Sequence, residues 1–131
     1  MKRLLLLAAI AACFAILPDY ASAQTKTRVR FARGTHSGVV KGTIRGYAYR
    51  DYLVGSGAGE MMEVSIDATN DGTVFTIFRP DGSNIEGAAE TVEYKGQLGP
   101  GGDYVIRVGM MRSAARRKGA TSTYTLKIMV Q

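Results

Sequence analysis

The stretch Thr123-Tyr124-Thr125-Leu126-Lys127-Ile128-Met129-Val130 decides the fold class of this chain. Every second position from Tyr124 onward carries a large apolar side chain, whereas Thr123, Thr125 and Lys127 are polar. Successive side chains of a β-strand point to opposite faces, so this alternation predicts a strand with one face in a core and the other in water.

The same period of two recurs through most of the chain. Residues 104–110 and 64–68 alternate in this way, and residues 74–78 are apolar on both faces, as expected for a central strand. Further strands are expected at residues 39–44 and 47–53, with weaker candidates at 29–31 and 92–98.

Turn-forming residues separate these segments, at positions 55–59, 69–72, 80–84 and 99–103. The pattern predicts an all-β fold: a single antiparallel β-sandwich domain of about 7–8 short strands, spanning residues 24–131 after a cleaved signal peptide. A helical turn is expected only at residues 111–118, between two strands.

Residues 1–23 have the features of an export signal. Lys2 and Arg3 precede an apolar stretch at 4–17, and the small residues before Gln24 predict cleavage after Ala23. Export to the periplasm follows, with no membrane association after cleavage. A minor alternative is a lipoprotein, in which Cys13 would become a lipidated N-terminus.

The chain is basic: it has 17 Lys and Arg against 11 Asp and Glu, which gives a formal net charge of +6. This balance raises the possibility of a nucleic-acid partner, but an exported protein does not meet cytosolic DNA or RNA. One Cys and one His exclude a disulfide framework and a Cys/His zinc site. No cofactor or metal is expected.

Two weaker possibilities involve isolated polar residues. Asp67, Asn70 and Asp71 offer oxygen ligands for calcium, although their spacing fits ordinary turn chemistry better. His36 lies beside Ser37, but neighbours on an extended chain point to opposite faces and cannot share a proton. The chain is therefore not expected to be an enzyme.

A tyrosine motif at residues 46–52 is the first candidate interaction site. On a strand, Tyr47 and Tyr49 share a face and Tyr52 points away from them. An exposed tyrosine is a rigid, amphipathic anchor for a partner's pocket. Core tyrosines with hydrogen-bonded hydroxyls are an equally good interpretation of the motif.

A basic connection at residues 110–119 is the second candidate. Arg112 and Arg116 are four residues apart, so they lie on one face if the connection is helical. Ser113 and Arg117 belong to the same candidate interface. The forked guanidinium suits carboxylates in an enclosed cleft. The segment contains no aromatic residue, which argues against nucleic-acid binding, and a solvated basic loop is the alternative.

With these motifs, the chain resembles the bacterial periplasmic inhibitors of goose-type (g-type) lysozyme. The resemblance runs from residues 29–31 to the final strand at 124–128 and includes the pattern Gly-Tyr-x-Tyr-x-x-Tyr at 46–52 and the turn at 98–104. Its most specific part is Arg-x-x-Ala-Arg, formed by Arg112, Ala115 and Arg116. The chain departs from the family at Ala48, where an acidic residue is expected, and across residues 80–95.

The resemblance implies a β-sandwich that inhibits g-type lysozyme by filling its substrate cleft, with the lysozyme as protein partner. It implies that Tyr47, Arg112 and Arg116 form the inhibitory surface. The motifs associated with inhibitors of chicken-type lysozyme, Ser-Gly-x-x-Tyr and Tyr-x-x-x-Thr-Lys-Gly, are absent. The alternative function is a non-catalytic periplasmic module that binds peptidoglycan or another anionic glycan. The oligomeric state is not predicted by any of these features.

Overall fold

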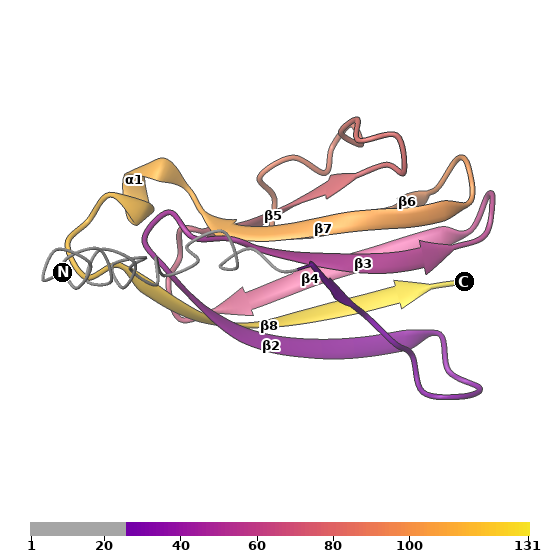
Figure 1. Cartoon of the computed structure of the whole chain (residues 1–131), viewed down its shortest axis with the longest axis horizontal. Helices are drawn as coiled ribbons and strands as arrows, with labels where there is room; N and C mark the ends of the chain where they lie inside the picture. The colour runs from indigo at the N-terminus through magenta and orange to yellow at the C-terminus, as the bar shows by residue number, and fades with distance from the viewer. Residues whose placement is uncertain (1–25) are drawn as a thin grey trace, which may run out of the picture.

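A computed structural model describes residues 26–131, which form two β-sheets stacked face to face (Figure 1). The signal peptide at residues 1–23 and the alternative lipidation at Cys13 lie outside the described residues. Within residues 26–131, no helix is long and apolar enough to cross a membrane.

Each sheet has four strands. Sheet A has the order β1-β3-β7-β5, and sheet B has the order β2-β8-β4-β6. The elements are β1 (Lys26–Arg28), β2 (Ser37–Arg45), β3 (Arg50–Ser56), β4 (Met61–Ala68), β5 (Thr73–Phe78), β6 (Glu93–Gln97), β7 (Gly102–Met110), α1 (Arg112–Ala115) and β8 (Thr121–Val130). All pairs are antiparallel except β1 and β3. The predicted β-sandwich is confirmed.

The decisive stretch of sequence forms β8, an inner strand of sheet B between β2 and β4. Its alternation is observed directly, because Tyr124, Leu126 and Ile128 are buried and Lys127 is exposed. In sheet A, β7 is an inner strand beside β3, and its residues Tyr104, Ile106 and Val108 are fully buried.

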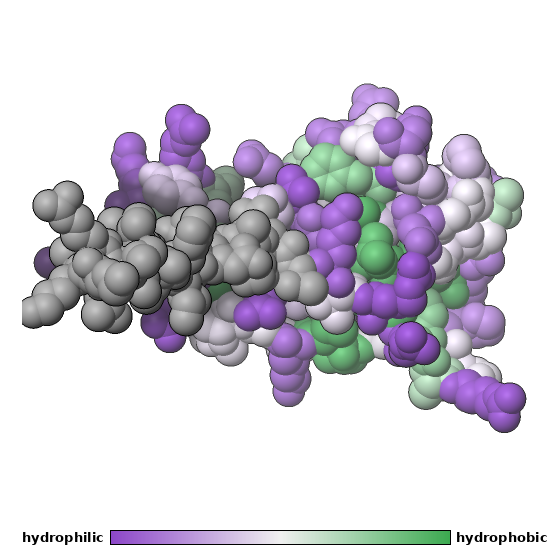
Figure 2. All heavy atoms as spheres, in the orientation of Figure 1, coloured by the Kyte–Doolittle hydropathy of each residue, from purple (hydrophilic) through white to green (hydrophobic). Residues whose placement is uncertain are grey.

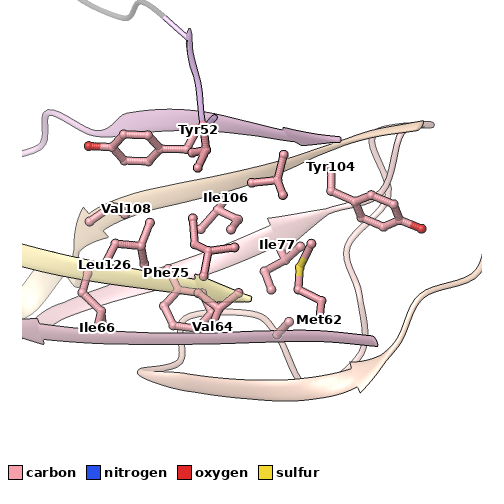
Figure 3. Packing of buried hydrophobic residues seen from close by; sticks show 14 of the residues in the cluster. Tyr52, Met62, Val64, Ile66, Phe75, Ile77, Tyr104, Ile106, Val108 and Leu126 are labelled. Carbon is pink, nitrogen blue, oxygen red and sulfur yellow. The ribbon is translucent and has the colours of Figure 1, made fainter. Parts of the chain in front are cut away.

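The core lies between the two sheets. Figure 3 shows side chains from sheet A, among them Phe75 and Ile106, pointing toward Met62, Val64 and Leu126 of sheet B. In the view of Figure 2, hydrophilic side chains project from the surface and apolar patches lie between them. Period-two alternation on the inner strands β7 and β8 thus accounts for one continuous core.

One pair of tyrosines links the two sheets inside this core. The hydroxyl groups of Tyr52 and Tyr124 are hydrogen-bonded to each other, and their rings meet edge to face with centroids 6.4 Å apart. Gly42 allows this arrangement, because a Cβ atom there would lie 2.5 Å from the Tyr124 hydroxyl oxygen. Tyr52 therefore belongs to the core, as the second interpretation of the tyrosine motif expects.

A short irregular segment covers the outer edge of β5. The amide of Phe75 donates to the carbonyl of Thr91 at 2.8 Å, and the amide of Ile77 donates to the carbonyl of Ala88 at 2.8 Å. The chain then enters sheet B as β6 and pairs with β4. Pairing of this kind removes a free strand edge that could otherwise recruit other chains.

Two predicted strand boundaries are wrong. The strand expected at residues 47–53 begins at Arg50, because Gly46 has a φ of +54° and the chain turns there before entering β3. The weak strand expected at residues 29–31 is β1 at Lys26–Arg28, although the Val29 amide still donates to the Leu53 carbonyl. Arg28 and Asp103 fix β1 in place through two hydrogen bonds of 2.9 and 2.7 Å, which lower the pKa of the Asp103 carboxyl.

Candidate functional site

Three connections meet at one end of the sandwich, which we call the loop end: residues 46–49, 69–72 and 111–120. Backbone hydrogen bonds tie them together. The Gly46 amide donates to the Ala120 carbonyl at 2.9 Å, and the Met111 amide donates to the Gly72 carbonyl at 2.8 Å. Figure 1 shows α1 beside the turn between β2 and β3. The loop end is therefore one connected structure.

The helix α1 (Arg112–Ala115) is a single turn held by its inner side. Ala115 is buried and its amide donates to the Met111 carbonyl at 2.8 Å. Ala114 packs so close to Gly72 that a Cβ atom at position 72 would lie 2.3 Å from the Ala114 Cβ. The predicted helical turn at residues 111–118 is confirmed over these four residues.

The basic side chains of this connection point into solvent. Arg112, Arg116 and Arg117 are exposed, and their side chains make no hydrogen bond or ion pair with the described residues. The Arg116 amide donates to the Arg112 carbonyl at 3.1 Å, so the two residues are one helical turn apart. Like charges held together without internal partners are available for an external anion.

A first groove, of about 230 Å³, brings part of the predicted site together. Tyr47, Tyr49 and Arg112 all line it, from two different connections. Tyr47 is the most exposed of these aromatic side chains, at 67% of its maximum, because it lies in the turn opened by Gly46. The expectation that Tyr47 and Tyr49 share a strand face is wrong, since both precede β3, but the turn still directs both toward one groove.

The other predicted residues lie on α1 (Ser113) or directly after it (Arg116 and Arg117). Ser113 and Arg117 line a second groove, whose opposite wall is the turn of Asn70 and Asp71. The Asn70 side-chain oxygen accepts a hydrogen bond from the Gly72 amide at 2.9 Å, as expected for turn chemistry. The predicted interface is thus divided between two sides of a short helix rather than gathered in one pocket.

Arg107 is a residue of this site that the sequence did not indicate. Its guanidinium donates to both carboxylate oxygens of Asp51, at 2.8 and 3.0 Å, and its pKa is raised mainly by this contact. The same guanidinium lies 4.2 Å from the ring centre of Tyr49 and 5.0 Å from that of Phe78. Such cation–π contacts fix the orientation of an aromatic ring.

The first groove also contains an acidic residue, Glu90. Its backbone has a φ of +47°, and its amide donates to the Thr76 hydroxyl at 3.0 Å. A positive φ is unusual for a residue with a side chain, so Glu90 lines the groove at some conformational cost. The groove is therefore mixed in charge, whereas the exposed side of α1 is basic.

Nothing in the described residues forms a metal centre: no group of three or more His, Cys, Asp or Glu side chains is close enough to hold an ion. His36 is exposed, and its backbone carbonyl accepts the Val130 amide at 2.9 Å. The buried carboxylate of Asp51 is already paired with Arg107.

Solved structures match both the fold and the sequence. The periplasmic inhibitor of g-type lysozyme (PliG) from Aeromonas hydrophila is similar to this chain, with 31% sequence identity and a TM-score of 0.71; the match covers 82% of this chain and 97% of that one. The chain belongs to the PliG family. No family model matches the sequence, and no curated protein matches it.

Two further PliG structures agree with this assignment. A PliG mutant from Escherichia coli is 26% identical with a TM-score of 0.66, over 83% of this chain and 99% of that one. PliG from Salmonella Typhimurium has the same fold at 23% identity and a TM-score of 0.62. The match covers 81% of this chain and 97% of that one. The periplasmic location of this chain, expected from residues 1–23, agrees with the description of these PliG proteins as periplasmic.

Proposed function

We propose that this PliG-family protein inhibits g-type lysozyme, and that its loop end enters the lysozyme's substrate cleft. The observation that carries the proposal is the set of exposed arginines at α1 and just after it, which make no hydrogen bond or ion pair with the described residues; one of them, Arg112, lines a groove with the exposed Tyr47. The inhibitory activity of the relatives named above supports it.

The chemistry of the target explains why arginine suits this role. A glycoside hydrolase needs carboxyl groups in its cleft, at least one of which acts as a general acid. Such a cleft is concave and partly dry, so an ion pair formed in it is stronger than one formed in open solvent. In this proposal Arg112 and Arg116 pair with the cleft carboxylates and Arg117 and Ser113 contact its rim.

Tyr47 supplies the apolar contact in this arrangement. Its ring is largely solvent-exposed in the unbound protein, so covering it in a complex removes apolar surface from water. Tyr49 is held against Arg107 and forms the neighbouring wall of the groove. An aromatic anchor beside charged groups is the usual composition of an energetic hot spot.

Rigidity makes this loop end suited to inhibition. The buried Ala115 and the contact of Ala114 with Gly72 hold α1 against the sandwich, and backbone hydrogen bonds tie its flanks to two other connections. Little conformational entropy is then lost when the loop end binds. The role requires occupancy of the cleft and no turnover, so the protein acts without catalysis.

The test is a lysis assay. Purified protein is mixed with a goose-type or a chicken-type lysozyme, and clearing of a peptidoglycan suspension is followed by turbidity. We expect loss of goose-type activity at a small molar excess, with chicken-type activity retained. Undiminished goose-type activity at a large excess would refute the proposal; if the protein then sediments with peptidoglycan alone, glycan binding is its function.

A further inference from the structure

Glu90 has an unusual backbone conformation. Among residues 26–131 it is the one residue other than glycine with a positive φ, at +47°. In this left-handed region the Cβ atom crowds the backbone, so glycine, asparagine or aspartate is the usual occupant. Strained backbone of this kind is concentrated at functional sites, where the surrounding structure imposes it. The presence of a glutamate here therefore requires an explanation.

The backbone around Glu90 is fixed to β5. The Glu90 amide donates to the Thr76 hydroxyl at 3.0 Å, and Thr91 and Phe75 exchange two backbone hydrogen bonds of 2.8 and 2.9 Å. These contacts impose the conformation of the chain, and none of them uses the Glu90 carboxylate. A glycine at position 90 could make the same backbone contacts with less strain.

The Glu90 side chain has no partner within the described residues. It is exposed, and its carboxylate forms no hydrogen bond or ion pair with them. Of the two arginines that line the same groove, Arg107 is already paired with Asp51, and Arg112 forms no ion pair. The fold therefore does not explain the charge at this position.

Glu90 and Tyr47 line the first groove from two sides of sheet A. The strand order β3-β7-β5 places Tyr47, which precedes β3, on one side and Glu90, which lies beyond β5, on the other. Between them lie Gly109 of β7 and Val74 of β5. The groove has a volume of only about 230 Å³, so a partner group that fills it against Tyr47 also contacts Glu90.

We propose that Glu90 is a specificity-determining residue of the inhibitory surface, and that its carboxylate binds a lysine or arginine side chain beside the lysozyme's cleft. This inference rests on the proposed function and adds one contact to it. The arginines at α1 suit any cleft lined by carboxylates, whereas Glu90 favours a target with a basic group next to that cleft. A target without this group would desolvate Glu90 without a counterion, which weakens binding.

Net charge alone predicts the opposite effect of Glu90. A cleft lined by carboxylates repels another carboxylate, so removing the Glu90 charge would then strengthen binding. A specific contact with a basic side chain requires that the same change weaken binding. The sign of the effect therefore distinguishes the two explanations.

The test measures binding of a goose-type lysozyme by titration calorimetry, with the chain beginning at Gln24. Glu90→Gln keeps the size of the side chain and removes its charge, and we expect about tenfold weaker binding for the loss of one interfacial ion pair. Glu90→Gly should weaken binding by a similar factor but unfold at an equal or higher urea concentration, because glycine adopts a positive φ without strain. Weaker binding by an equally stable protein excludes misfolding as the cause.

Glu86→Gln is the matched control. Glu86 is an exposed acidic residue of the same connection, forms no ion pair with the described residues and does not line the groove. The control variant loses the same charge and should bind as tightly as the unchanged protein. A salt concentration of about 0.5 M should reduce the difference between Glu90→Gln and the unchanged protein, because salt screens exposed charges.

The partner of Glu90 is identified by substitutions in the lysozyme. Lysines and arginines beside its cleft are changed to glutamine one at a time. One of these changes should weaken binding of the unchanged protein about tenfold and leave binding of Glu90→Gln unaffected, which is the signature of a direct pair in a double-mutant cycle.

Two results would overturn the proposal: Glu90 variants that bind as tightly as Glu86→Gln or more tightly, or no lysozyme substitution that couples to Glu90. The proposed function would survive either result if Arg112→Ala still weakens binding. If the unchanged protein binds no goose-type lysozyme, the proposed function and this inference both fail.

Discussion

Arg107 and Asp51 lie directly opposite each other on β7 and β3, and their side chains form a two-pronged ion pair on the outer side of sheet A. Asp51 is 5% exposed, although it has a full charge. Tyr49 stacks on the same guanidinium. The wall of the first groove is therefore fixed by an ion pair located within the sheet.

Replacing Arg107 should destabilise the fold. Arg107→Ala leaves the buried Asp51 carboxylate without its cation, and we expect a loss of about 2 kcal/mol in the free energy of unfolding, less than for a fully buried pair because Arg107 is partly exposed. Urea denaturation measures this loss of unfolding free energy. The double variant Asp51→Asn/Arg107→Gln should lose less unfolding free energy than Arg107→Ala, because it leaves no unpaired charge. A larger loss in the double variant would contradict this explanation.

Gly72 should be required for the position of α1. Gly72→Ala introduces a Cβ atom 2.3 Å from that of Ala114, so α1 must shift, at a cost of about 1–3 kcal/mol. Ala114→Gly removes the opposing methyl group and should recover part of both stability and inhibition in the double variant. A double-mutant cycle without favourable coupling would show that the two residues do not act through this contact.

The arginines of α1 should dominate inhibition beyond their charge. Arg112→Ala and Arg116→Ala are each expected to weaken binding of goose-type lysozyme by about 30-fold, corresponding to about 2 kcal/mol for an anchor at an interface. Arg33→Ala removes the same charge outside the loop end and serves as the control. Equal losses in all three variants, measured by titration calorimetry, would indicate that net charge alone drives binding.

Tyr47 should contribute through its ring. Tyr47→Phe is expected to retain most of the affinity, whereas Tyr47→Ala should lose about tenfold or more, because the buried apolar area is removed. Neither change should alter thermal stability, since the side chain is 67% exposed. A Phe variant as weak as the Ala variant would assign the contact to the hydroxyl group instead.

Alkaline pH should destabilise the protein through Tyr124. Burial and the hydrogen bond with Tyr52 raise the pKa of Tyr124 well above its ordinary value of 10.0. Below pH 10 the Tyr124 hydroxyl keeps its proton in both the folded and the unfolded protein. Above pH 10 the unfolded chain loses this proton first, so the free energy of unfolding falls by about 1.4 kcal/mol per pH unit. Denaturation at pH 9 to 11 should show a steeper loss in the unchanged protein than in Tyr52→Phe/Tyr124→Phe.

Sheet B could be predicted from sequence more easily than the start of β3. Burial on one face imposes a strict period of two, which is visible in β8 without any knowledge of its neighbours. The turn at Gly46 is different, because glycine also occurs within strands and the tyrosines that follow fit a strand pattern. A turn hydrogen bond from Ala48 to Arg45 and a hydrogen bond from Gly46 to Ala120, remote in sequence, fix the boundary.

The part of the candidate site whose residues are close in sequence could be predicted from the sequence. Arg112 and Arg116 are close in sequence and remain one helical turn apart in the structure. The role of Arg107 depends on the register of β7 against β3, and alternation alone does not determine which residues of two strands lie opposite. The separation of Ser113 and Arg117 from Tyr47 likewise depends on where α1 meets the turn at Gly72.

The segment along the edge of β5 is attached to the sheet through its backbone. Its attachment at Phe75 and Ile77 uses main-chain amides and carbonyls, which every residue except proline can provide in both directions. Side chains there are consequently less constrained, apart from the buried Ile85 and Ala88 and from the hydrogen-bonded Asp81 and Ser83. Substitutions within residues 80–95, where we expect the sequence to depart from the family pattern, should therefore cost little stability.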